Sequence, residues 1–429
     1  MLNHTYLQSV ATEGLQEDNG YVLADPTAQA PTLLRAVYHK KQLRVREENE
    51  GIFRFADWLP VERFIHSDGS PVTYRSEGLA TLLGLSNLYI TFNGYWPEKG
   101  ANMRTGTFKE CEAYSVCARK PADEQILVVS SAGNTARAFM KVASENKIPL
   151  LLVVPEKNLG SLWSIEEVDP CVKLIAVGGD ADYTDAIHLA DAICALDGFV
   201  SEGGAKNVAR RDGMGTTVLS AATTIGEIPD YYFQAVGSGT GVIAAHEANL
   251  RLNESGDYTP KTMKLFASQN LPFVPMAQAW GKKSRALDPM NEEETVRQID
   301  TILAKVLSNR QPPYGLTGGL YDVLSAADGE MPTVENSEVI EAQRLFAELE
   351  GWDICPEAGV ALASLMQKTN DGTIDKNGIV MLNVTGGGMQ ALAREFDLKQ
   401  KAADLIVPKD ELSTQTVSER IASLYGKGI

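Results

Sequence analysis

The sequence has few of the residues that build disulfide frameworks or metal sites. Its 429 residues include five cysteines, an odd number, and no two of them form a CxxC pair. Its five histidines form neither an HExxH nor an HxH motif. These absences argue against a disulfide scaffold, a zinc ribbon and a histidine-based metal centre, so no metal site is expected.

Positive charge is also scarce. The chain has 39 Lys and Arg against 56 Asp and Glu, which gives a formal net charge of −17. Proteins that bind nucleic acid carry clustered positive charge, so nucleic acid is not an expected partner. An anionic small molecule would need a local basic cluster, which can act because salt screens the global field beyond about 8 Å.

Long apolar runs are missing as well. The longest candidate, IPLLLVVP at 148–155, is far shorter than the ~20 residues of a membrane span and reads as a buried strand. No membrane association is therefore expected. The first residues, MLNHTYLQSVATEG, lack the basic start and apolar core of a signal peptide, which predicts a cytoplasmic protein.

What the chain does contain is a regular alternation of strand and helix patterns beyond residue 80. Strands are predicted at 87–93, 125–131, 148–156, 172–179, 231–237, 264–269 and 379–388. Helices are predicted at about 134–145, 182–197, 211–226, 241–252, 338–350 and 357–368. This order predicts an α/β fold whose parallel strands are covered on both faces, with ligands at the carboxyl ends of the strands. Residues 1–75 carry few periodic signals, although 51–64 reads as a packed aromatic segment.

The stretch MRTGTFKECEA, residues 103–113, places Lys109 directly after Gly106, Thr107 and Phe108. A lysine that bonds covalently to a carbonyl cofactor must be partly neutral and rigidly held, usually on a turn beside an aromatic ring. Phe108 would provide that ring. The alternative is a solvated surface lysine.

A second stretch, SSAGNTARAF at 130–139, follows a predicted strand and opens a predicted helix. Backbone N–H groups at such a helix start can bind a carboxylate or a phosphate. The side chain of Asn134 would be able to donate to a ring oxygen. The alternative is an ordinary turn in which Asn or Ser caps the helix.

A third stretch, VGSGTGVIAAHEA at 236–248, again joins a strand to a helix through a glycine loop. Gly237, Gly239 and Gly241 would let backbone amides wrap closely around a phosphate. The spacing is GxGxG, not the GxGxxG of a dinucleotide fold, and the GK[ST] of a P-loop is absent. A monophosphate site is therefore predicted.

The fourth stretch, NVTGGGMQ at 383–390, is a late strand end with three glycines. Thr385 would be able to hydrogen-bond a ring nitrogen, although a simple tight turn is the alternative. Together the four stretches offer a nucleophilic lysine, a partner for a ring hydroxyl, a phosphate anchor and a partner for a ring nitrogen. A pyridoxal phosphate site needs these four parts.

With these motifs in this order, residues 74–395 resemble the fold-type II pyridoxal-phosphate family, the tryptophan synthase β-like group. The resemblance implies two domains, each with a mostly parallel sheet flanked by helices, and pyridoxal 5′-phosphate in the crevice between them. It also implies that Lys109 binds the cofactor covalently, Asn134 its ring oxygen and Thr385 its ring nitrogen. The implied phosphate cup consists of Gly237, Ser238, Gly239, Thr240 and Gly241. ICPEAGVALASL at 354–365 resembles the start of a late helix of the family.

The resemblance further implies a domain division and a homo-oligomer. Residues 1–75 would pack as an N-terminal segment on the large domain. The large, cofactor-binding domain would comprise 76–111 and 225–429, and residues 112–224 would form a smaller inserted domain.

Within the family, the chain is most similar to the threonine synthase branch. The substrate stretch of that branch, N-P-x-R-x-x-G-x-x-T, is matched by NVARRDGMGT through Asn207, Arg210, Gly213 and Thr216, with Val208 in place of the proline. Threonine synthase acts on a phosphorylated amino acid, and guanidinium groups bind phosphate bidentately. The basic cluster of Lys206, Arg210 and Arg211 would suit such a group, and a solvated charged face is the alternative.

Threonine synthases continue the lysine motif with Asp-Arg, whereas this chain has Glu110 and Cys111, which argues against threonine synthesis. The stretch 74–113 is more similar to a paralogue of that enzyme in coenzyme M biosynthesis. This implies a β-replacement in which O-phospho-L-serine and sulfite give L-cysteate and phosphate, with Lys109 as the base. The expected substrate contacts are Ser130, Ser131, Gly133, Thr135, Arg104, Lys206, Asn207 and Arg210. Two alternatives stay open: a threonine synthase acting on O-phosphohomoserine, and a non-enzymatic phosphate-binding module.

Overall fold

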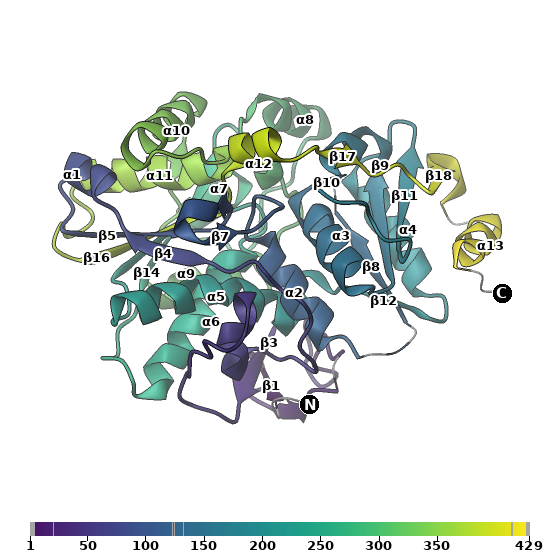
Figure 1. The fold of residues 1–429 in the computed structure, drawn as a ribbon, viewed down its shortest axis with the longest axis horizontal. Helices are drawn as coiled ribbons and strands as arrows, with labels where there is room; N and C mark the ends of the chain where they lie inside the picture. Colours follow the sequence, from purple (N-terminus) through teal and green to yellow (C-terminus); the bar gives the residue numbers. More distant parts are fainter. Residues whose placement is uncertain are drawn as a thin grey trace.

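Two sheets of mostly parallel strands lie side by side and carry the motifs described above (Figure 1). The computed structural model describes residues 5–19, 21–121, 123, 125–131, 133–412 and 415–425. The larger sheet has six strands, of which β4 pairs antiparallel with its neighbour. In spatial order they are β15 (Thr333–Val334), β14 (Lys264–Asn270), β13 (Tyr231–Ala235), β16 (Ile379–Val384), β5 (Asn87–Phe92) and β4 (Val72–Arg75).

The smaller sheet has five strands that all run parallel. In spatial order they are β12 (Phe199–Ser201), β8 (Ile126–Ser130), β9 (Leu150–Pro155), β11 (Val172–Gly178) and β18 (Leu405–Pro408). Every residue of β9 is buried, as expected for a parallel strand that is covered on both faces. The α/β architecture predicted from the sequence is confirmed.

Helices cover both faces of the two sheets. In chain order they are α1 (Gly78–Leu83), α2 (Lys109–Arg119), α3 (Asn134–Asn146), α4 (Tyr183–Cys194), α5 (Val208–Ile225), α6 (Thr240–Ser255), α7 (Pro275–Gly281), α8 (Glu292–Thr301), α9 (Leu320–Ala326), α10 (Asn336–Glu350), α11 (Pro356–Asn370), α12 (Met389–Glu395) and α13 (Gln415–Leu424). In Figure 1, α10 and α11 lie above the larger sheet and α5 and α6 below it. The smaller sheet packs against α3 and α4. No helix of the described part of the chain is long and apolar enough to cross a membrane.

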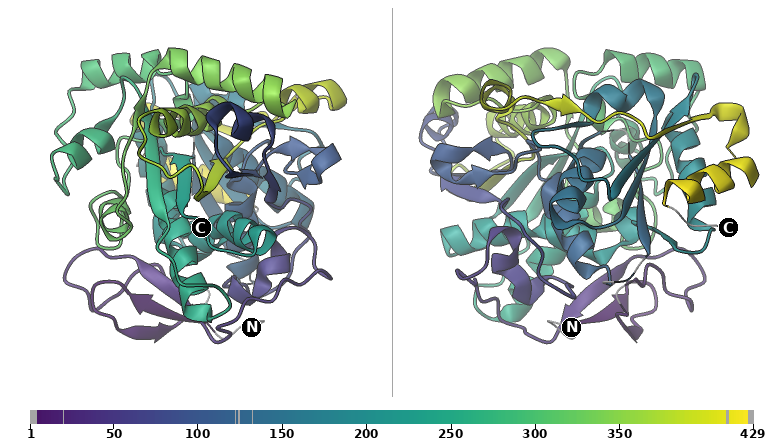
Figure 2. Two further views of the ribbon diagram at one scale, coloured as in Figure 1. Left: turned by 90° about the vertical axis from the view of Figure 1, so that its left-hand side faces the viewer. Right: turned by 45° about the vertical axis from the view of Figure 1, so that its right-hand side comes forward.

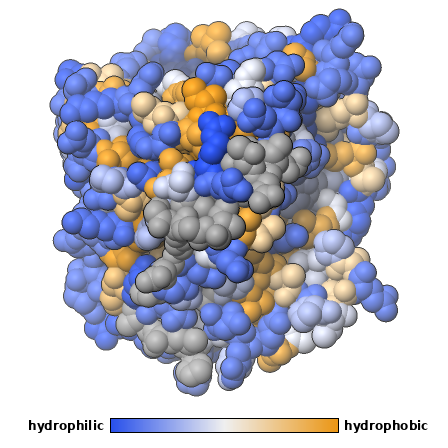
Figure 3. Space-filling model, turned by 90° about the vertical axis from the view of Figure 1, so that its right-hand side faces the viewer, coloured by the Kyte–Doolittle hydropathy of each residue, from blue (hydrophilic) through white to orange (hydrophobic). Residues whose placement is uncertain are grey.

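The C-terminal segment returns from the larger sheet to the smaller one. It runs past α12, pairs β17 (Lys399–Gln400) with β10 (Trp163–Ser164), and adds β18 to the edge of the smaller sheet (Figure 2). Both β17 and β18 therefore pair with strands of the region predicted as the inserted domain, and the exact domain boundaries stay a prediction. Figure 3 shows the face at this end of the molecule, where apolar side chains form small groups among polar ones.

The N-terminal region forms a small antiparallel sheet that sequence patterns did not reveal. Its strands, in the order β2 (Leu15–Glu17), β1 (Thr5–Ser9) and β3 (Leu34–Tyr38), are only three to five residues long. Leu7, Leu33 and Leu34 pack against the core beneath α5 and α6. Strands this short give too few alternations for a periodic signal. The predicted aromatic segment is confirmed in part: Phe53, Phe55 and Trp58 are buried, whereas Phe64 is exposed.

Two local predictions were wrong. Lys109 is the first residue of α2 and not a turn residue, and α5 begins at Val208, earlier than the predicted Arg211. The sequence of α2, KECEAYSVCAR, looks solvated because it is rich in charge. Three of its charged side chains, Glu110, Glu112 and Arg119, are nevertheless buried, because each has a partner of opposite charge.

Candidate active site

The start of α2 is joined to the end of β16 by backbone hydrogen bonds. The N–H of Phe108 donates to the carbonyl oxygen of Thr385 at 3.0 Å, and the N–H of Gly387 donates to that of Gly106, also at 3.0 Å. Gly106 has φ +73°, a conformation that favours glycine. The lysine motif and the TGGG motif therefore form one paired structure, and it places Lys109 beside the carboxyl end of a central strand.

The amine of Lys109 lies in a confined setting. Its side chain is 19% exposed, and Nζ lies 4.9 Å from the centroid of the Phe108 ring. Nζ donates to Oε2 of Glu112 at 3.2 Å. Burial lowers the pKa of the Lys109 amine, Glu112 opposes this shift, and the charge of Arg210 adds to it. The solvated surface lysine is thus not what the structure shows.

Glu112 is fully buried and connects Lys109 to Arg210. Besides Lys109, it accepts hydrogen bonds from the hydroxyl of Thr135 at 2.8 Å and from Nε and Nη2 of Arg210 at 3.1 and 3.0 Å. Arg210 also donates to both oxygens of Glu202, at 2.7 and 2.8 Å. Burial raises the pKa of Glu202, and Arg210 opposes that shift. Two cations and two carboxylates therefore form one buried cluster.

Arg210 reaches this cluster because α5 crosses α2 at very short range. A Cβ built on Gly213 would lie 2.3 Å from the carbonyl oxygen of Cys111 and 2.9 Å from Cβ of Ser115. Only glycine fits there without a shift. Arg210 lies about one helical turn before Gly213, so this crossing brings its guanidinium over Glu112.

Asn134 is the first residue of α3, and both ends of its amide are engaged. Its Nδ2 donates to Oε1 of Glu357 at 3.1 Å, and its Oδ1 accepts from Nη2 of Arg137 at 2.9 Å. Arg137 can only donate hydrogen bonds, and an ionised Glu357 can only accept them. The two contacts therefore fix the orientation of the Asn134 amide. One of the two N–H donors on Nδ2 is left unused. Burial raises the pKa of Glu357, and Arg137 opposes the rise.

The loop between β8 and α3 lies next to the cluster. Thr135 binds Glu112 as described, and the carbonyl of Ser130 accepts from the hydroxyl of Tyr183 at 3.2 Å. The hydroxyl oxygen of Ser130 is buried and has no hydrogen-bond partner within the described residues. Ser131 and Gly133 lie in the same loop, partly exposed, and Ala132 lies outside the described residues.

The glycine loop 237–241 joins β13 to α6, as the sequence predicts. Gly239 has φ +77°, and the hydroxyl groups of Ser238 and Thr240 lie 2.9 Å apart. The loop precedes a helix of 16 residues, whose first N–H groups have no partners within the helix. Phe108 forms one apolar cluster with Met214 of α5 and Ala244 of this helix, which brings α6 close to the start of α2.

Two of the predicted substrate contacts, Arg104 and Asn207, are bonded to other groups. Arg104 pairs with Asp68 at 2.8 Å and with Glu166 at 3.1 Å. Asn207 caps α5, since its side chain accepts from the N–H of Ala209 at 3.0 Å. Lys206 is exposed in a short 3-10 turn before α5.

Arg211, the last member of the predicted basic cluster, pairs with a carboxylate of α6. It is fully buried and pairs with Glu247 at 2.9 Å. Of this cluster, only Arg210 contacts the groups around Lys109.

Three carboxylates near Lys109 and Asn134 were not predicted from the sequence: Glu112, Glu202 and Glu357. The sequence offered one signal for Glu112. It follows Lys109 by three residues, so the two side chains would lie on the same face if this segment formed a helix. Glu202 and Glu357 gave none, since tertiary contacts alone bring them to Arg210 and Asn134.

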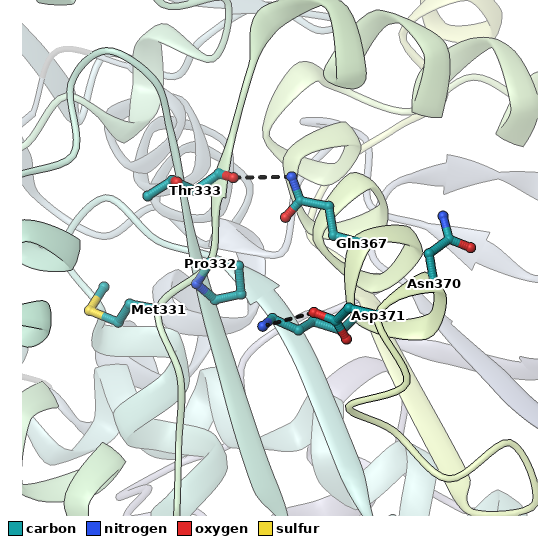
Figure 4. Close-up of a pocket in the computed structure, with 7 residues that line it drawn as sticks. Met331, Pro332, Thr333, Gln367, Asn370 and Asp371 are labelled. Carbon is teal, nitrogen blue, oxygen red and sulfur yellow. Dashed lines mark hydrogen bonds and ion pairs between the residues drawn. The ribbon is translucent and has the colours of Figure 1, made fainter.

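One open hollow on the larger region contains none of these residues. It is lined by Met331, Pro332, Thr333, Gln367, Lys368, Asn370 and Asp371 (Figure 4). Gln367 donates to the carbonyl oxygen of Thr333, and Lys368 pairs with Asp371. The hollow lies at the C-terminal end of α11, and Glu357 lies near the other end of that 15-residue helix, roughly 20 Å away. It is therefore separate from the Lys109 site. No cluster of three or more His, Cys, Asp or Glu suited to a metal occurs among the described residues.

Comparison with known proteins identifies the class. The family described as "Pyridoxal-phosphate dependent enzyme" matches residues 92–386, which is more than half of the chain. The chain belongs to this family. It is 48% identical to the cysteate synthase of Methanosarcina barkeri, over 86% of this chain and 88% of that protein. It is 47% identical to the cysteate synthase of Methanocorpusculum labreanum, over 91% of this chain and 95% of that protein.

Solved structures agree on the fold. Maize serine racemase matches with a TM-score of 0.55 at 14% identity, over 76% of this chain and 90% of that one. A pyridoxal 5′-phosphate-dependent aspartate racemase matches with a TM-score of 0.56 at 17% identity, over 75% of this chain and 92% of that one. The fold-type II resemblance inferred from the motifs is confirmed.

Proposed function

We propose that this protein is a pyridoxal phosphate-dependent cysteate synthase, which converts O-phospho-L-serine and sulfite into L-cysteate and phosphate. The observation that carries the proposal is the 48% identity to a cysteate synthase, over 86% of the chain. The site around Lys109 supports it, because it supplies a confined amine beside a glycine loop and a partly free amide.

The residues present fit the cofactor. Lys109 offers the amine, Asn134 one unused N–H for the ring oxygen, and the loop 237–241 the N–H groups at the start of α6 for the phosphate. Thr385 is buried at the end of β16 and would face the ring nitrogen as a neutral hydroxyl. The hydroxyl oxygen of Thr107, within the paired loops, is buried and has no partner in the described part of the chain. When bound, pyridoxal phosphate supplies the electron sink for charge that develops at Cα.

Lys109 is the proposed base. Burial lowers its pKa, so more of its amine is neutral near pH 7 than in a solvated lysine. A neutral amine can bond to the cofactor and can later take the proton from Cα of the substrate. Glu112 lies within hydrogen-bond distance of the same nitrogen and would stabilise it once protonated.

The remaining residues bind and orient the substrate. The N–H groups of the loop 130–135 are proposed to hold the substrate carboxylate at the start of α3. Phosphate leaves Cβ with the electron pair of the C–O bond, and the sulfur of sulfite forms the new bond to the same carbon. Lys206 is proposed to face the phosphate, while Arg104, Asn207 and Arg210 would first have to release the partners described above.

The decisive experiment measures phosphate release from protein loaded with pyridoxal phosphate. O-phosphoserine with and without sulfite is compared with O-phosphohomoserine, and the amino-acid product is identified. Cysteate formed from phosphoserine and sulfite is the expected result. Release only from phosphohomoserine, with threonine as the product, would instead establish a threonine synthase. A protein that stays colourless with the cofactor and releases nothing would be a phosphate-binding module.

A cytoplasmic location and a homo-oligomer are also proposed. The first rests on the composition of the chain, and the second on the family resemblance. Light scattering of the purified, cofactor-loaded protein tests the oligomeric state.

A further inference from the structure

Glu112 and Arg210 are both saturated with hydrogen bonds in this structure. Each oxygen of Glu112 accepts twice: Oε2 from Lys109 and Arg210, and Oε1 from Thr135 and Arg210. An ionised carboxylate has about four acceptor positions, so none is left over. A buried carboxylate is costly unless it is paired and hydrogen-bonded, which this arrangement achieves.

The N–H donors of the Arg210 guanidinium are also all used. It has five N–H donors. They match five acceptor contacts, two to Glu112, two to Glu202 and one to Thr135 at 3.3 Å. Four of the five contacts are to carboxylate oxygens, so a phosphoryl group could bind Arg210 through two N–H groups only by displacing a carboxylate contact.

We propose that Glu112 is a positioning residue that holds the amine of Lys109, and that Arg210 anchors Glu112 and is not the contact for the substrate phosphate. The inference rests on the proposed function, since it assigns roles within that site. Its geometric basis is the helix itself. Residues three apart on α2 share one face, and the crossing of α5 at Gly213 fixes Arg210 on the far side of the same carboxylate.

The charges of the cluster determine what this contact does. Protonated Lys109 and Arg210 balance the carboxylates of Glu112 and Glu202. If Lys109 loses its proton, two carboxylates face one guanidinium. Glu112 therefore favours the protonated amine, while burial and Arg210 favour the neutral one. Without the charge of Glu112, Lys109 would be neutral at lower pH, and it would be a weaker base towards Cα.

The test uses the cofactor-free protein and three variants. In Glu112→Gln the side chain keeps its size and loses its charge. In Glu112→Asp the side chain keeps its charge but is one methylene group shorter. Glu202→Gln is the matched control, because it removes a carboxylate from Arg210 without touching Lys109. The rate of pyridoxal phosphate attachment is followed by visible absorbance from pH 6 to 10, without any amino-acid substrate, and circular dichroism confirms folding.

The midpoint of the pH profile should move down by about one unit or more in Glu112→Gln, the size expected when an opposite charge within 4–6 Å is lost. In Glu202→Gln the shift should be clearly smaller. In Glu112→Asp the midpoint should stay near wild type while attachment slows. Equal shifts in the two Gln variants, or an unshifted profile in folded Glu112→Gln, would overturn the proposal. If Glu112→Gln does not fold, a wild-type attachment rate in Glu112→Asp would overturn it alone.

A second readout separates positioning from substrate binding. In Glu112→Gln, kcat with phosphoserine and sulfite should fall at least tenfold, while KM for phosphoserine changes less than threefold. A large rise in KM with unchanged kcat would assign Glu112 and Arg210 to substrate binding instead. The attachment profile needs no substrate, so it still tests this inference even if wild-type protein makes no cysteate.

Discussion

The backbone N–H of Phe108 donates to the carbonyl oxygen of Thr385 at 3.0 Å, which joins the start of α2 to the end of β16. This contact puts Lys109 at the carboxyl end of a central parallel strand, where ligands bind in open α/β sheets. It links two motifs from distant parts of the sequence, and a pyridoxal phosphate site requires both of them nearby.

Lys109→Ala should abolish the visible absorbance of the bound cofactor and lower phosphate release from phosphoserine at least about a thousandfold. The covalent attachment and the base are lost together. Absorbance spectra and the phosphate assay measure the two effects. A variant that kept both its colour and its activity would remove Lys109 from the mechanism. Lys368→Ala, in the separate hollow of Figure 4, is the control and should match wild type.

Gly213→Ala should destabilise the protein by about 1–3 kcal/mol, because the new methyl group would lie 2.3 Å from the carbonyl oxygen of Cys111. It should also weaken cofactor binding, since α5 carries Arg210. The control is Gly215→Ala in the same helix, where the nearest atom is 3.5 Å away and alanine is the better helix former. Urea denaturation compares the two, and equal stability would contradict the close crossing of α2 and α5.

Glu357→Ala should weaken pyridoxal phosphate binding about fivefold, because Asn134 loses the acceptor that fixes its amide. Glu357→Gln, which keeps an acceptor, should lose less. Ser364→Ala on the same helix is the control, since that hydroxyl donates to the carbonyl oxygen of Ala361 within α11. Fluorescence titration of cofactor-free protein gives the affinities. Unchanged affinity in Glu357→Ala would mean that Asn134 is oriented without Glu357.

Stability should fall in mild acid because of His246. Burial, with Arg35 nearby, lowers the pKa of His246 from 6.5 to about 4. His246 therefore binds a proton near pH 6.5 in the unfolded chain, but only near pH 4 in the folded protein. The stability is fully present above pH 6.5 and is lost as the pH falls, by about 2 kcal/mol at pH 5. Wild type and His246→Gln are compared by urea denaturation at pH 7.5 and 5. Parallel losses in both would rule out this histidine as the cause.

The strands and their loops could be predicted because their signals are local. An apolar run such as LLLVVP in β9 needs burial on both faces, and a glycine loop between a strand and a helix offers free N–H groups wherever it occurs. The nature of α2 could not be predicted in this way. Its charged residues are buried because of partners such as Asp18, Lys141 and Arg210, which other elements supply.

The sequence by itself determined the α/β class and contained the four motifs from which a pyridoxal phosphate site was predicted. Each depends on residues close together in the chain, so spacing and composition express it. Only the tertiary structure decided that Glu112 holds Lys109, that Arg210 is enclosed by two carboxylates, and that Glu357 orients Asn134. These contacts depend on how α2, α3, α5 and α11 pack. Buried charges require partners, but a sequence does not state which segment will supply them.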